Sequence, residues 1–189
     1  MTVKEIFSNL TNHMVKGLMV HDQMIHYYLF LELEGYAKCH KYHYYEESKT
    51  YNKVVYHYFK YHNKLIEPQK IDNPNLIPQS WYQYEQKDVD INTKRSAVKS
   101  GLEEWLKWEK ETEKLYKTFY KELLTLEEYN DAKLLEELLC HVTEEIAEIN
   151  KYCIEKKSTD YNINAIMEEQ TKKKHKYRKK LHNKCCYCD

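Results

Sequence analysis

The chain has 189 residues, enough for one domain with a hydrophobic core or for a domain followed by a tail. Its 30 basic and 30 acidic residues cancel, so the overall charge predicts neither a nucleic-acid partner nor a membrane partner. With only three glycines and three prolines, all of the prolines within 68–78, the sequence has few turn signals and predicts long helices.

The sequence contains no membrane-spanning pattern. No run of about 18 apolar residues occurs, and the first residues lack the apolar stretch of a signal peptide. We therefore expect a cytoplasmic protein, in which the six cysteines are thiols and not disulfides.

Two helices are predicted at 2–33 and 36–65. Thr2 and Glu5 have the spacing of a capping box, which begins the first helix, and Gly35 is the expected left-handed stop between the two. The first helix has an apolar stripe with 3/4 spacing that includes Gly17 and His21. The stripe of the second helix is unusually polar and reads Tyr36, His40, His43, Glu47, Thr50, Val54, His57, Tyr61.

A long crossover is predicted at 67–92, followed by helices at 94–124 and 129–156. Glu109 is the only charged residue on the stripe of the third helix. In the fourth helix the stripe is broader, and His141 and Glu145 lie on its edge. These four helices, at 1–157, are the predicted bundle.

The region 158–189 is predicted to hold a short basic helix and a tail with cysteines. Residues 172–184 include eight Lys or Arg and no acid, which would suit a phosphate backbone or simply a solvated helix end. We expect the solvated helix end. Cys185, Cys186 and Cys188 with His182 could hold zinc or copper, but their spacing is not that of a zinc finger.

Polar residues recur at one level of the predicted bundle. If the first turn lies between Glu34 and Gly35, His21 is level with position 48, beside Glu47, and a turn near Leu126 places Glu109 beside Glu145. Imidazoles and carboxylates that meet in a bundle suit iron, manganese or zinc. A metal-free hydrogen-bond network, or helix faces assigned wrongly, would explain the same pattern. The candidate ligands are His21, His43, Glu47, Glu109, His141 and Glu145.

This arrangement resembles the ferritin-like superfamily: two antiparallel hairpins, a long crossover between the second and third helices, mid-helix ligands and a further helix. The usual superfamily ligands are a Glu on the first and third helices and Glu-x-x-His on the second and fourth. Here Glu109 fits that set, whereas His21 replaces a Glu and the pair His43 and Glu47 has the reverse order.

The resemblance implies an all-α, ferritin-like antiparallel four-helix bundle in a divergent member. It also implies a metal-binding protein, with a di-metal iron or manganese oxidoreductase as the specific form and zinc as a lesser choice. The alternative is a metal-free helical scaffold with a central His/Glu network. We expect self-association through the tyrosine-rich faces.

Overall fold

The computed structural model describes residues 1–66 and 89–185, with side chains described as far as residue 182. The described residues form five helices and no strand: α1 (Val3–Phe30), α2 (Glu34–His62), α3 (Ile91–Thr125), α4 (Tyr129–Ser158) and α5 (Ile163–Cys185). The predicted crossover at 67–92 lies mostly outside the described residues. The predicted terminal cluster of Cys185, Cys186 and Cys188 also lies outside them, because side chains are described only as far as residue 182.

Local signals in the sequence explain where the helices begin and turn. Thr2 and Glu5 form the predicted capping box at the start of α1. The Asp90 side chain accepts the backbone N–H of Thr93 at 2.7 Å and caps α3. The left-handed residue between α1 and α2 is Glu32, with φ of 58°. The predicted role of Gly35 is therefore wrong, since Gly35 lies inside α2.

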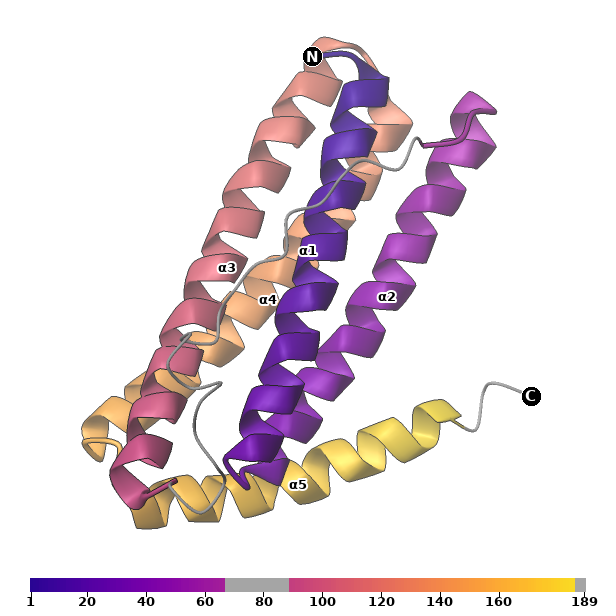
Figure 1. The fold of residues 1–189 in the computed structure, drawn as a ribbon. Helices are drawn as coiled ribbons and strands as arrows, with labels where there is room; N and C mark the ends of the chain where they lie inside the picture. Colours follow the sequence, from indigo (N-terminus) through magenta and orange to yellow (C-terminus); the bar gives the residue numbers. More distant parts are fainter. Residues whose placement is uncertain (67–88, 186–189) are drawn as a thin grey trace.

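The helices are arranged as two hairpins and a closing helix. α1 packs along α2, α3 packs along α4, and α5 lies across the end of the bundle against the start of α2 (Figure 1). Short turns join the helices within each hairpin, so each pair is antiparallel. This is the predicted all-α four-helix architecture with an additional C-terminal helix.

The core consists of two apolar clusters at different levels of the bundle. One includes Phe7, Val54 and Leu135, at the end where α2 finishes and α4 begins. The other includes Tyr28 and Leu102, at the end that α5 covers. The residues between these clusters are polar, and they include buried histidines and a buried glutamate. The polar level predicted from the sequence thus separates two hydrophobic halves.

Gly35 has a packing role that the sequence alone did not reveal. A Cβ at this position would lie 1.9 Å from the backbone oxygen of Gln170 on α5. Ile166 and Tyr177 of α5 are fully buried and belong to the same apolar cluster as Tyr28. α5 is therefore part of the packed body of the protein.

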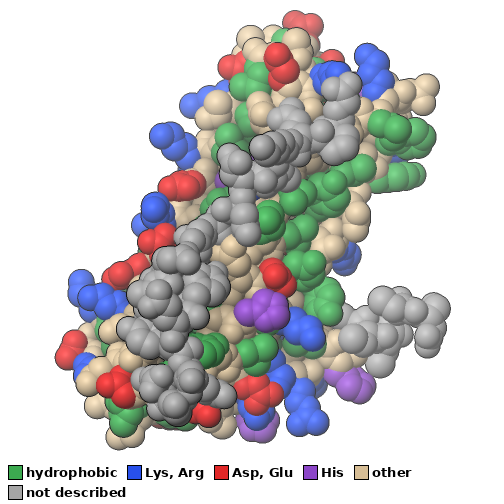
Figure 2. Space-filling model, in the orientation of Figure 1, with side chains coloured by type: hydrophobic (Ala, Val, Ile, Leu, Met, Phe, Trp, Pro, Cys, Tyr) green, Lys and Arg blue, Asp and Glu red, His purple; other side chains and the backbone are tan. Residues whose placement is uncertain are grey.

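Several basic residues of α5 are used within the molecule. Lys173 is buried, Lys174 pairs with Glu34, and Lys176 Nζ lies 2.9 Å from Glu148 Oε1. Acidic and basic side chains are interspersed along the left and lower parts of the face drawn in Figure 2. No helix in the described ranges is long and apolar enough to cross a membrane.

Candidate metal centre

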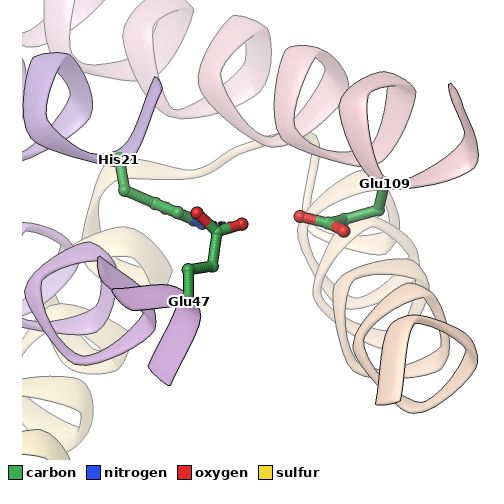
Figure 3. Close-up of side chains that lie close together, drawn as sticks. All are labelled: His21, Glu47 and Glu109. Carbon is green, nitrogen blue, oxygen red and sulfur yellow. Dashed lines mark ion pairs between the residues drawn. The ribbon is translucent and has the colours of Figure 1, made fainter. Parts of the chain in front are cut away.

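Three predicted ligands from three helices meet in the polar level. His21 of α1, Glu47 of α2 and Glu109 of α3 each offer a ligand atom, and these atoms all lie within 4.8 Å of one another. Figure 3 shows His21 and Glu47 side by side, with Glu109 pointing toward them from α3. His21 and Glu109 are buried, and Glu47 is partly exposed. Two carboxylates and one imidazole form a donor set that suits iron, manganese or zinc.

His21 is oriented from both sides. Its Nδ1 lies 2.9 Å from Nδ1 of the buried His40, and its Nε2 lies 3.6 Å from Glu47 Oε1. Burial first, and then the neighbouring His21 and His43, hold the pKa of His40 well below its usual value, so the His40 ring is neutral and its Nδ1 can accept a hydrogen bond from the His21 Nδ1–H. In that tautomer His21 Nε2 carries a lone pair directed toward Glu47.

Glu109 is a buried acid that accepts one hydrogen bond from the described residues. The Trp105 indole N–H donates to Glu109 Oε1 at 3.1 Å. Burial, followed by the negative charges of Glu145 and Glu47, raises the pKa of Glu109 well above its usual value. Without a cation nearby, burial therefore favours the neutral, protonated form of Glu109.

His43 and Glu145 form a second pair beside the cluster. His43 Nδ1 lies 2.7 Å from Glu145 Oε1, and the same ring interacts with the thiol of buried Cys39. Burial disfavours the charged ring, but the contacts with Cys39 and Glu145 outweigh burial and raise the pKa of His43 to about 10. Burial likewise opposes ionisation of Glu145, yet His43 lowers its pKa. The pair is thus an imidazolium and a carboxylate joined at His43 Nδ1.

The sixth predicted ligand, His141, does not belong to the cluster. His141 is exposed, as expected for a residue on the edge of the α4 stripe, and it lies outside the three-residue cluster. Sequence reasoning missed His40 and Trp105 as the partners that hold His21 and Glu109. His40 was already on the polar stripe of α2, and Trp105 is one helical turn before Glu109. Both signals could have found them.

A cleft connects the cluster with solvent. It has a volume of about 580 Å³ and is lined by residues from all five helices, including Gly17, His43, Glu47, Glu109 and Glu145. His141 lines it too, together with Glu144. The predicted ligands therefore all contact either the cluster or the cleft beside it.

The fold is similar to those of solved ferritins. A crystal structure of an engineered closed form of the Archaeoglobus fulgidus ferritin matches with a TM-score of 0.75 and 10% identity, covering 92% of this chain and 96% of that one. The apo-ferritin of Pseudo-nitzschia multiseries and a PmFTN variant soaked in iron each match with a TM-score of 0.71 and 12% identity. Each of these two matches covers 89% of this chain and 96% of the other.

Comparison by sequence finds no such likeness. No protein-family model matches the chain, and no curated protein sequence matches it. The likeness thus lies in the arrangement of the helices, and the low identity is that of a divergent chain. The protein has the ferritin-like fold.

Proposed function

We propose that the protein binds a divalent iron or manganese ion with His21, Glu47 and Glu109. The observation that carries this proposal is the approach of their ligand atoms to within 4.8 Å in a level of the bundle that separates two apolar clusters. Charged groups are costly in such an interior unless they are paired or bind a metal. A cation between the two carboxylates would remove that cost.

The residues present fit a metal ion. Glu47 Oε2 is buried and has no hydrogen-bond partner among the described residues, so it is an unsatisfied ligand atom. Gly17 leaves the space in which the Glu47 carboxylate lies, because a Cβ there would come within 2.8 Å of Oε2. His40 supports the Nδ1 side of His21, which is the usual arrangement for a histidine that binds metal through its other nitrogen.

A second ion would use His43 and Glu145, which are near enough to Glu109 to affect its pKa. This second position is weaker, because its ligands are already joined by the 2.7 Å contact of His43 with Glu145. Binding there would have to break that ion pair and displace a proton from His43. We therefore infer sequential loading, with the first ion at His21, Glu47 and Glu109.

Iron is the preferred metal of the proposal. The structural neighbours are ferritins, and one of them was solved after soaking in iron. When bound, iron or manganese would supply redox chemistry with oxygen or peroxide. The protein side chains hold the ion, orient His21 through His40, and admit solvent through the cleft.

The test is metal uptake by three versions of the full chain. Wild type, Glu109→Gln and the control Glu111→Gln are titrated anaerobically with Fe²⁺ and separately with Mn²⁺, and bound metal is determined by elemental analysis. Glu111 is an exposed residue on the same helix and is not in the three-residue cluster. Its variant makes the same chemical change as Glu109→Gln without touching the proposed ligands. We expect at least one equivalent per chain in wild type and control, and loss of that equivalent in Glu109→Gln.

Equal uptake by the three proteins would overturn the assignment of Glu109. Absence of uptake in all three would favour a metal-free scaffold. In that scaffold the contacts of His21 with His40 and of His43 with Glu145 would serve the structure alone.

A further inference from the structure

The cleft beside the metal centre is larger than metal binding requires. Its volume is about 580 Å³, whereas one water molecule needs only about 10–15 Å³ of space measured in this way. An ion with its coordinated waters would leave most of the cleft unfilled. Pockets for small organic molecules measure roughly 300–1,000 Å³, so the size alone favours an organic ligand.

One wall of the cleft is aromatic. The ring of Trp108 stacks on His13 with centroids 4.5 Å apart and an interplanar angle of 4°, and Tyr116 lies edge-on to His13 at 6.4 Å. His13 Nε2 also lies 2.7 Å from Thr112 Oγ1, so this wall is anchored across the interface of α1 with α3. Burial, and next the charge of Lys16, lowers the pKa of His13 to about 4, which makes the ring neutral. The wall is therefore flat, uncharged and held in place.

The remaining lining is rich in carboxylates that the metal centre does not use. Glu46, Glu144 and Glu148 line the cleft in addition to the acids of the centre. Three lysines line it as well: Lys53 is bonded to Glu137, Lys180 lies over the ring of Tyr42, and Lys49 is exposed. Glu148 is paired with Lys176 outside the cleft lining. The exposed carboxylate of Glu144 is thus available to a positively charged ligand.

We propose that this cleft binds a small organic cation with an aromatic ring, beside the metal centre. The ring would lie against the wall formed by Trp108 and His13, and the positive charge would face Glu144. Aromatic faces and carboxylates both favour such a ligand over a neutral or anionic one. Because Glu47 and Glu109 line the same cleft, the bound molecule would lie next to the metal. The role of the organic ligand beside the metal thus rests on the proposed function, whereas its binding in the cleft can be tested without metal.

The test uses three probes on the metal-free full chain at constant ionic strength. Benzylammonium carries both the ring and the charge, methylammonium carries the charge alone, and benzoate carries the ring with the opposite charge. Isothermal titration calorimetry should give benzylammonium an affinity at least about tenfold above that of either other probe, a difference of about 1.4 kcal/mol. Equal affinities for benzylammonium and benzoate, or no binding of benzylammonium, would overturn the proposal.

Two variants test whether benzylammonium binds in the cleft. Trp108→Ala removes the flat wall, and Glu144→Gln removes the exposed charge without changing the core. Each should weaken benzylammonium binding by about tenfold, a loss of about 1.4 kcal/mol. The control Glu136→Gln changes an exposed acid of α4 that does not line the cleft, and should leave the affinity unchanged. An equal effect of Glu144→Gln and Glu136→Gln would exclude binding in the cleft.

The outcomes for the cleft and for the metal centre are separable. Binding of benzylammonium by a protein that takes up no Fe²⁺ or Mn²⁺ would retain the cleft as a ligand site and reject the proposed metal function. Metal uptake at Glu109 without benzylammonium binding would retain the metal function and reject the organic ligand. Glu144→Gln should leave metal uptake at the level of wild type, since Glu144 is not in the three-residue cluster.

Discussion

Gly17 of α1 lies directly against the carboxylate of Glu47 on α2. A Cβ built on Gly17 would be 2.8 Å from Glu47 Oε2 and 2.9 Å from Oε1. This distance is too short for a real contact, so the absence of a side chain at position 17 allows the Glu47 carboxylate to lie beside His21.

Gly17→Ala should separate metal affinity from stability. The new methyl group would push the Glu47 carboxylate away from His21, and we expect at least about a tenfold loss of Fe²⁺ affinity. Alanine also favours a helix interior by roughly 1 kcal/mol over glycine, so the metal-free variant should melt no lower than wild type. Calorimetric titration and thermal unfolding check the two results. A large fall in melting temperature would mean that Glu47 cannot move aside.

Glu109→Gln should stabilise the metal-free protein, increasingly so as the pH rises. The pKa of Glu109 is raised by burial, then by Glu145 and Glu47, so above about pH 4.5 the unfolded chain releases a proton that the folded chain keeps. Wild type then loses stability with rising pH, by at most about 1.4 kcal/mol per unit, until the pH passes the folded pKa. Glutamine has no such proton and can still accept the Trp105 N–H.

Urea unfolding between pH 5 and pH 8 measures this difference. The stability of Glu109→Gln relative to wild type should grow across that range in the presence of a chelator. A constant difference would mean that Glu109 is ionised in the folded metal-free protein. Added Fe²⁺ should reverse the order of the two proteins, because it stabilises only the form that binds it.

Asp131→Ala should destabilise the end of the bundle remote from α5. Asp131 is 1% exposed, and its two oxygens lie 2.8 Å from His57 Nε2 and 2.9 Å from His62 Nε2. Removal of this carboxylate leaves two imidazoles without their partner, at a cost of about 2–4 kcal/mol. Chemical denaturation checks this value. The control is Asp22→Ala, which breaks the exposed contact of Asp22 with His26 and should cost less than about 0.5 kcal/mol.

Gly35→Ala should loosen α5 without changing the proposed metal ligands. The added Cβ would meet the backbone of Gln170, which cannot rotate away as a side chain can. We expect a loss of about 1–3 kcal/mol and faster amide exchange in 163–182. Gly17→Ala is the comparison, since there the new atom meets only the end of a flexible side chain. Unchanged exchange in α5 would show that the helix can shift as a unit.

Much of the candidate metal centre could be predicted from helical periodicity in the sequence. His21 and Glu109 interrupt apolar stripes, and the short turn between α1 and α2 makes the level of His21 coincide with that of Glu47. These relations depend on spacing within a helix or across one short turn, which sequence records directly. The all-α bundle followed for the same reason, together with the shortage of glycine and proline.

Other features depend on contacts between distant segments. The sequence does not show that the α5 residue Lys173 is buried with its Nζ 3.9 Å from Cys39 Sγ, or that Gly35 receives the backbone of α5. The basic run that contains Lys173 predicts a solvated helix, and nothing in its sequence distinguishes a packed face from an exposed one. The cleft is equally hidden, because residues of five helices line it and no single stripe records it.

The position of α5 also bears on how the chain folds as it is synthesised. α5 is made after α1 to α4, yet it covers Tyr36 at the start of α2 and supplies Tyr177 to the apolar cluster there. During translation the opposite end of the bundle, with Phe7 and Leu135, can pack first, while the face around Tyr36 stays uncovered. That apolar face therefore stays in contact with water until α5 has been made.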